Sequence, residues 1–204
     1  MGLISAATTI FDAGSMSAGF GGNMTFIKKL TASSSATLSF VDGSGGVVLD
    51  DTYKEYVFTF KNIHPQTGTK LFEVNMSIDT GSNYNVAKTT TNAEIYHAEN
   101  GSAAGLGYVS GKDLANGTGK LKISSEIGAE NDECCNGFLR LFNPSSTVFV
   151  KHFISDVQGN YNATFSINHK IAGYCNSTSA VDAVQFTFTS GNIDAGDICL
   201  YGIA

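Results

Sequence analysis

The sequence predicts an all-β protein: an antiparallel, jelly-roll-like β-sandwich of about ten strands, preceded by an irregular N-terminal arm. Several segments alternate apolar and polar residues with a period of two, which is typical of strands that bury one face in an antiparallel sheet. No window shows the 3.6-residue apolar stripe of an amphipathic helix. Gly, Ser, Thr and Asn make up 79 of the 204 residues, a composition suited to turns and to the polar faces of strands.

The clearest alternation runs from Leu71 to Asp79, where polar residues separate four apolar ones: Phe72, Val74, Met76 and Ile78. Similar alternation within Tyr53–Ile63 places Tyr56, Phe58 and Phe60 on one face. Short strands separated by turn residues favour a sandwich or a barrel. The pattern predicts ten strands: Leu38–Val41, Tyr53–Ile63, Leu71–Asp79, Asn92–His97, Lys120–Ser124, Gly137–Asn143, Thr147–Val157, Tyr161–Tyr174, Asp182–Thr189 and Asp197–Ile203.

The first 25 residues differ from the rest of the chain and are predicted to form an arm. Glycines interrupt them at four positions between 14 and 22, which disfavours regular elements. Scattered apolar side chains would hold a neighbouring subunit or the surface of a larger particle: Leu3, Ile4, Ile10, Phe11 and Phe20. A terminus that binds nothing is the alternative. The predicted domains are residues 1–25 as the arm and residues 26–204 as the β-sandwich.

Charge is low and acidic. Asp, Glu, Lys and Arg total 15% of the residues and the net charge is −6, whereas charged residues are about 25% of a typical soluble domain. Arg140 is the single arginine, so nucleic acid is not an expected partner. No apolar run approaches the ~18 residues of a membrane span. Because no Lys or Arg precedes the short apolar stretch at the start of the chain, a secretory signal is not expected either.

No motif predicts catalysis, a cofactor or a metal. The four histidines (64, 97, 152 and 169) lack metal-ligand spacing, and structural or surface roles are favoured for them. Neither a nucleophile elbow nor a phosphate-binding loop is present, so we expect a protein that is not an enzyme. The loop from Glu126 to Glu133 holds four carboxylates. Its spacing does not match the EF-hand loop, and a solvated loop is favoured over a calcium site.

The four cysteines also lack a metal-binding pattern. Cys134 and Cys135 are adjacent, and no C-x-x-C pair occurs, which argues against a zinc ribbon. Reduced thiols are the favoured interpretation. A bridge between Cys175 and Cys199 remains the alternative.

Two loops are rich in the residues of adaptable recognition surfaces, in which Tyr supplies contact area and Asn supplies hydrogen bonds. Turn formation alone would also explain them. The segments 98–119 and 125–136 are predicted to be long loops, which tend to be functional. The candidate recognition residues are Asn83, Tyr84, Asn85, Asn160, Tyr161 and Asn162.

A series of segments across residues 26–203 resembles a β-rich domain that is common among virion structural proteins of marine tailed bacteriophages, where it often ends tail-fibre-like proteins. These segments occur in the order Tyr56-Val-Phe-Thr-Phe-Lys-Asn-Ile-His-Pro65, Gly81-Ser-Asn-Tyr-Asn85, Leu141-Phe-Asn-Pro-Ser-Ser-Thr147 with Val150-Lys-His-Phe153, Ala172-Gly-Tyr174, Ser190-Gly-Asn-Ile193 and Leu200-Tyr-Gly-Ile203.

The resemblance implies a non-enzymatic structural protein on the outer surface of a virion, either a tail appendage or a head decoration, assembled in bacterial cytoplasm. Its expected partners are other copies of itself, most simply in a trimer, and other virion proteins. A carbohydrate- or receptor-binding lectin-like module is the alternative, with host surface glycan as the partner. A glycan-cleaving tailspike is disfavoured because the chain lacks the internal repeat of a long β-helix.

Overall fold

The computed structural model describes the backbone of residues 3–5, 8–12, 15–16, 23–161 and 164–204, and the side chains of residues 23–161 and 164–204. Within these residues the chain forms an antiparallel β-sandwich, as the sequence predicts. The three first strands, β1 (Leu3–Ser5), β2 (Thr8–Asp12) and β3 (Ser15–Met16), form a separate three-stranded sheet. The sandwich itself contains twelve strands in sheets of eight and four.

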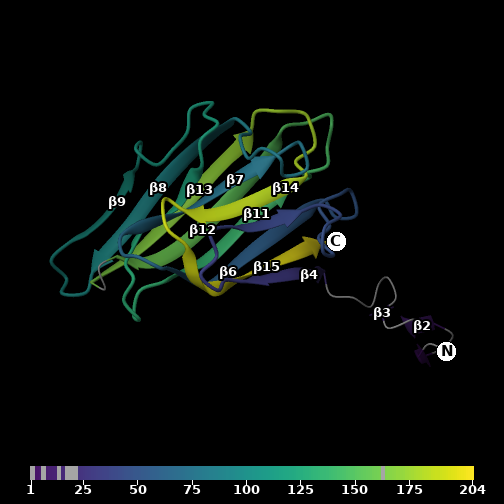
Figure 1. Cartoon of the computed structure of the whole chain (residues 1–204), viewed down its shortest axis with the longest axis horizontal. Coiled ribbons are helices and arrows are strands. Elements are labelled where there is room, and N and C mark those ends of the chain that lie inside the picture. Colours follow the sequence, from purple (N-terminus) through teal and green to yellow (C-terminus); the bar gives the residue numbers. More distant parts are fainter. Residues whose placement is uncertain (1–2, 6–7, 13–14, 17–22, 162–163) are drawn as a thin grey trace.

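The larger sheet has the strand order β4-β15-β6-β11-β12-β13-β8-β9. Figure 1 shows β4 and β9 at its opposite edges. The bounds in spatial order are β4 Met24–Thr31, β15 Ile193–Ile203, β6 Glu55–Pro65, β11 Cys135–Phe142, β12 Lys151–Tyr161, β13 Phe165–Cys175, β8 Lys88–Ala98 and β9 Ala104–Tyr108. The smaller sheet has the order β10 (Leu121–Ile127), β7 (Lys70–Ser77), β14 (Ala183–Phe188) and β5 (Leu38–Val41).

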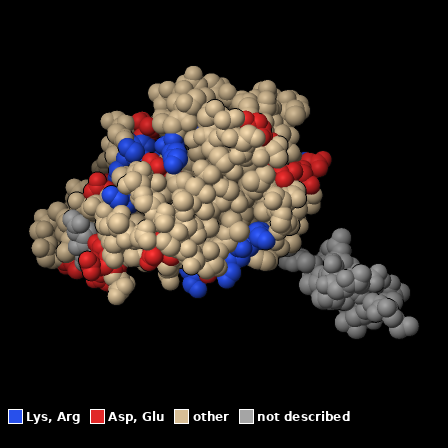
Figure 2. Space-filling model, in the orientation of Figure 1, with Lys and Arg blue, Asp and Glu red and all other residues tan. Residues whose placement is uncertain are grey.

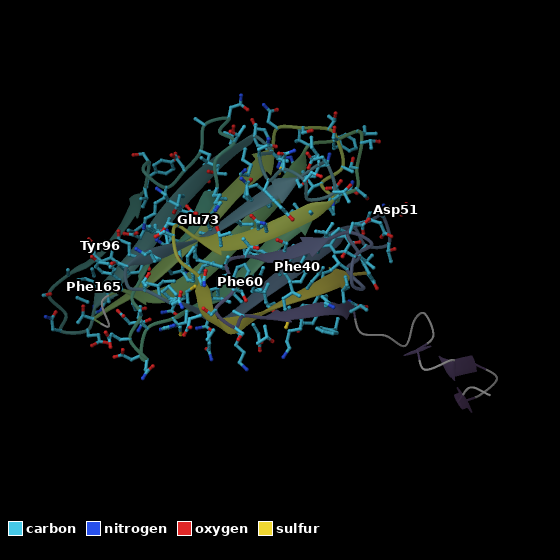
Figure 3. All side chains as sticks on the ribbon, viewed as in Figure 1. Phe40, Asp51, Phe60, Glu73, Tyr96 and Phe165 are labelled. Carbon is cyan, nitrogen blue, oxygen red and sulfur yellow. The ribbon has the colours of Figure 1, made fainter. Side chains whose placement is uncertain are left out.

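A cluster of phenylalanines holds the two sheets together. The ring centroid of Phe186 lies 5.2 Å from that of Phe60, 5.5 Å from Phe58 and 5.7 Å from Phe72. Phe40 joins the cluster, and Figure 3 labels it and Phe60 near the middle of the sandwich. Each aromatic pair adds roughly 0.5–1.5 kcal/mol beyond its buried area. These residues occupy the faces that the alternation in β6, β7 and β14 predicts to be apolar.

All ten predicted strands are present, and two further strands of the sandwich, β4 and β9, were not expected. Both are edge strands of the larger sheet, and most of their residues are exposed or half-buried. A strand that buries neither face lacks the alternation on which the prediction depends. Since β9 falls inside the predicted loop 98–119, that loop is interrupted, and β10 shortens the loop predicted at 125–136.

The sandwich begins at Met24, where β4 starts, two residues before the predicted domain boundary. Within the described part of the chain no helix is long and apolar enough to cross a membrane.

Candidate functional site

The outward face of the larger sheet is the candidate functional surface. It forms because successive side chains of each strand point alternately toward the core and away from it. On β12, Phe153, Ser155 and Val157 are buried toward the smaller sheet, whereas His152 and Ile154 are exposed. The same alternation on β6 turns Tyr56 and Phe58 inward. We call the opposite side of this sheet the outer face. It comprises the side chains of β4, β15, β6, β11, β12, β13, β8 and β9 that point away from the core.

Apolar side chains gather on the outer face. Nine large hydrophobic residues are exposed in the described part of the chain, and strand register places six of them there. Ile78, Val148 and Phe149 are the other three and lie in loops. Exposed apolar groups concentrated on one face are typical of interaction sites. The six are Met24, Phe26, Ile95, Leu106, Tyr108 and Ile154.

The single arginine of the chain is held on this face. Its guanidinium lies 3.0 Å from a carboxylate oxygen of Glu55 and 5.6 Å from the centre of the Phe138 ring. Arg140 pairs with Val57 on one side and with Ile154 on the other. Farther along, Phe26 packs against Tyr201 with ring centroids 5.7 Å apart. Apolar and aromatic side chains from several strands therefore lie around the guanidinium of Arg140, which is paired with Glu55.

The middle of the outer face is hollowed where small residues stand between large ones. An open cavity of about 380 Å³ is lined by Phe142, His152, Ile154 and Tyr174 around Ala172 and Thr91. A second cavity, of about 240 Å³, is also lined by Thr91, Ile154 and Ala172. The rings of His152 and Tyr174 lie 5.9 Å apart. This part of the face therefore combines ring surfaces with threonine hydroxyls.

Most charged groups on the outer face are paired with each other. Asp156 of β12 accepts hydrogen bonds from the Lys170 ammonium and from the Asn168 amide, the latter at 2.5 Å. Partial burial of Asp156 acts to raise the pKa of its carboxyl, but the hydrogen bonds from Asn168 and Lys170 outweigh it and lower that pKa. The outer face thus carries little unpaired charge. In the view of Figure 2, most of the molecular surface is tan, and the charged side chains lie in a few small groups.

The two candidate recognition segments lie at opposite ends of the larger sheet, and Asn160 and Tyr161 belong to β12 rather than to a loop. Asn85 precedes Lys88, which is in register with Cys175 and Lys151, whereas Tyr161 pairs with Phe165 at the other end. The eleven residues of β12 between these ends span roughly 35 Å. Figure 3 shows Phe165, with Tyr96 beside it, far from Asp51 at the opposite end. The two segments therefore do not form one site.

Two of the six candidate recognition residues, Asn83 and Asn160, form hydrogen bonds within the chain through their side chains. Asn83 donates its backbone N–H and its side-chain amide to the Asp79 carboxylate at 2.8 and 2.7 Å. Asn160 accepts the N–H of Cys134 at 2.9 Å and donates to the carbonyl of Asp132. Asn85 is exposed and Tyr84 is half-buried. Asn162 lies outside the described residues.

The structure does not describe the side chains of the candidate arm residues. Phe20 lies outside the described residues. For Leu3 and Ile4 in β1 and for Ile10 and Phe11 in β2, the structure describes the backbone alone. Within the predicted arm, the short strands β1, β2 and β3 pair with each other.

A buried polar cluster surrounds His169, which the sequence did not single out among the histidines. Its ring is fully buried on the inner face of β13, with Nδ1 2.9 Å from Asn92 Oδ1 and Nε2 3.1 Å from Glu94 Oε2. Lys112 reaches over the ring and lies 3.2 Å from Nε2. Burial, and then the nearby charge of Lys112, lower the pKa of His169 to about 3. The imidazole is neutral at pH 7, which fits the structural role expected for it.

In the described part of the chain no group of three His, Cys, Asp or Glu residues is placed to hold a metal ion. Glu133 is buried and accepts the N–H of Glu130 at 3.3 Å.

All four cysteines are free. Cys175 points into the core, whereas Cys199 alternates with the buried Ile198 and Leu200 and points outward. The alternative of a Cys175–Cys199 bridge is therefore wrong.

No family model, no curated protein and no solved structure matches this chain. The site is thus interpreted from its own geometry.

Sequence patterns alone did not reveal the outer face. The alternation in β12 does indicate that Ile154 and Phe153 point in opposite directions. Ile154 is an apolar residue on the otherwise polar side of this strand, and it was the signal in the sequence that could have indicated the outer face. Which face of which sheet is covered, however, depends on pairing between strands that are distant in sequence.

Proposed function

We propose that this chain is a non-enzymatic structural protein on the outer surface of a tailed-phage virion, where it binds neighbouring copies or other virion proteins through its outer face. The observation that carries the proposal is the concentration of exposed apolar side chains on a wide sheet with little unpaired charge. An obligate interface resembles a domain core cut in half. The resemblance of residues 26–203 to virion proteins supplies the biological setting, and a tail appendage is favoured over a head decoration.

Particle incorporation tests this proposal. A lysine on the outer face should oppose burial against a neighbour because an unpaired charge is costly to desolvate. Ile154→Lys should reduce the number of copies per purified particle by roughly tenfold, the effect of about 1.4 kcal/mol. Ile78→Lys is the matched control, since Ile78 is 40% exposed and Ile154 is 46% exposed, and only Ile154 lies on the outer face. Equal incorporation of the two variants would count against the proposal.

The N-terminal segment is proposed as a second attachment. Because β4 begins at Met24, deletion of residues 2–22 leaves every strand of the sandwich intact. The shortened protein should fold with an unchanged unfolding midpoint and should fail to join the particle. Full incorporation would show that the segment does not anchor the protein.

Counting copies per particle by mass spectrometry separates a tail appendage, present in few copies, from a head decoration, present in hundreds.

A second candidate function, carbohydrate binding, is favoured by the hollow between His152 and Tyr174. Aromatic rings and threonine hydroxyls suit the apolar and hydroxyl-bearing faces of a sugar. A glycan array with the intact protein tests it. Binding that Tyr174→Ala abolishes and Tyr84→Ala leaves unchanged would support this site. No binding at millimolar sugar would remove this candidate and leave the structural role untouched.

A further inference from the structure

A lysine is buried without a counter-ion at the end of the sandwich where β7 and β8 lie close. Lys88 starts β8, points to the inner face and is fully buried. Its Nζ lies 2.5 Å from Oδ1 of Asn75 and 2.6 Å from the carbonyl oxygen of Val86. No carboxylate of the described residues forms an ion pair with it. Buried lysines are rare unless they are paired, so this one calls for an explanation.

The carboxamide of Asn75 is held rigidly beside this amine. Its Oδ1 accepts the N–H of Met76 at 2.9 Å, and its Nδ2 donates to the carbonyl oxygens of Tyr84 at 2.5 Å and Thr118 at 3.2 Å. Asn75 is only 3% exposed. Given a C=O bond of about 1.23 Å, the 2.5 Å contact places Cγ of Asn75 within about 3.7 Å of Lys88 Nζ, close to the separation of reacting atoms in a near-attack geometry.

The surroundings make the amine nucleophilic. Burial lowers the pKa of Lys88 to about 8, so roughly a tenth of the amine is uncharged at pH 7. The titratable group that faces it is the thiol of Cys175, in register with Lys88 on β13. Burial raises the pKa of this thiol to about 11, so the thiol stays protonated. Desolvation of a lysine is a recognised way to activate it for attack on a carbonyl group.

We propose that Lys88 and Asn75 form an intramolecular isopeptide bond after the chain folds. The Nζ lone pair attacks Cγ of Asn75, and the carbonyl electron pair moves onto Oδ1, where the Met76 N–H stabilises the developing charge. The bond from Cγ to Nδ2 then breaks, and Nδ2 takes a proton from Nζ and leaves as ammonia. The products are one secondary amide and one ammonia molecule, so the reaction requires neither an oxidant nor a cofactor.

The bond would join β7 to β8 across the intervening segment 78–87. The two residues are 13 positions apart, so the cross-link closes a short loop at one end of the sandwich. A covalent loop removes conformational freedom from the unfolded chain and so stabilises the fold. The inference is independent of the proposed function, although a covalently closed sandwich suits a protein exposed on a particle surface.

The mass of the intact protein tests the proposal directly. The purified wild-type chain should be lighter than its sequence mass by one ammonia molecule. Trypsin should fail to cut after Lys88, because an amide replaces the ammonium that the protease recognises. Cleavage at Asp79, which lies between the two residues in sequence, should leave the Asn75 and Lys88 fragments joined. A mixed population supports the proposal if its lighter fraction maps to this pair.

Controls separate this bond from other losses of ammonia. Asn–Gly sequences at Asn100, Asn116 and Asn136 can lose ammonia by closing a ring onto their own backbone, but no such ring joins two fragments. Lys88→Arg and Asn75→Ala should each restore the full sequence mass. An unmodified wild-type mass, free fragments after cleavage at Asp79, or an ammonia loss that persists in Lys88→Arg would overturn the proposal.

Discussion

The two outward faces of the sandwich differ in a way that composition alone would not suggest. On the smaller sheet the outward residues are polar and nevertheless buried: Glu73, Asn75 and Thr187 are each less than 8% exposed. On the larger sheet the outward residues include Phe26 and Ile154, which are about half exposed. Other segments of the same chain accept hydrogen bonds from Asn75 on the smaller sheet, through the carbonyl oxygens of Tyr84 and Thr118. Among the described residues the larger sheet has no such cover, which is why we propose that a neighbour supplies it.

Truncation of a core residue should change the free energy of unfolding more than any other substitution considered below. Phe186 contacts the rings of Phe58, Phe60 and Phe72 between the sheets, so Phe186→Ala should lower the free energy of unfolding by about 3–5 kcal/mol. Phe26→Ala on the outer face should change it by about 0.5 kcal/mol or less. Urea denaturation followed by circular dichroism measures both. Similar losses in the two variants would mean that the outer face already packs against something within the chain.

Acid should destabilise the protein through His169. Its pKa is lowered from 6.5 to about 3 in the folded chain, so between these values the unfolded state binds more protons than the folded state. Stability is therefore fully present above pH 6.5 and falls with pH toward 3, by up to about 1.4 kcal/mol per pH unit. The groups that face the ring are Glu94, Lys112 and Asn92. His169→Asn should flatten this slope in urea titrations between pH 4 and pH 6, and an unchanged slope would contradict the assignment.

Replacing a buried hydroxyl on the smaller sheet should stabilise the protein. The Oγ1 atom of Thr187 is buried and has no hydrogen-bond partner. An unsatisfied buried hydroxyl is costly, and valine has nearly the same shape, so Thr187→Val should raise the free energy of unfolding by roughly 1 kcal/mol. Thr147, which is exposed, provides the control, and Thr147→Val should have little effect. A loss of stability in Thr187→Val would mean that the hydroxyl has a partner after all.

The smallest effect is expected at Glu73, also on the smaller sheet. Burial raises the pKa of its carboxyl above 4.5, although Lys120 and Lys122 oppose the shift. The folded state therefore favours the protonated acid, and stability is lost as pH rises above 4.5. Glu73→Gln should be slightly more stable than the wild type at pH 7 and equal to it below pH 4. A variant that is less stable at pH 7 would indicate that the two lysines dominate.

Local patterns in the sequence predict the core well. Alternation in β6, β7 and β14 correctly turns Phe58, Phe72 and Phe186 toward the other sheet. The same pattern in β7 also suggested that Glu73 and Asn75 face solvent, and they are buried instead. The carbonyl oxygens of Tyr84 and Thr118, which lie outside β7, accept hydrogen bonds from Asn75, and no local pattern encodes such contacts. The edge strand β9 was missed for a related reason, since Leu106 and Tyr108 remain exposed.

The candidate site was less accessible to prediction than the core. The segments around Asn83 and Asn160 attracted attention by composition, but their amides form hydrogen bonds within the chain. The hollow at His152 and Tyr174 depends on the register of β12 with β13, which a single sequence does not specify. The pairing of Lys88 with Asn75 joins two strands through buried side chains. Lys88 is the first residue of β8 and precedes the predicted strand Asn92–His97, so no local pattern indicated that it would be buried.

An image of the assembled particle by electron cryo-microscopy, with this chain placed in it, tests the proposed role of the outer face most directly. The expected result is that Phe26, Tyr201 and Ile154 of the larger sheet are buried against a neighbouring subunit. An image in which this face lies open to solvent while the smaller sheet meets the neighbour would contradict the proposal.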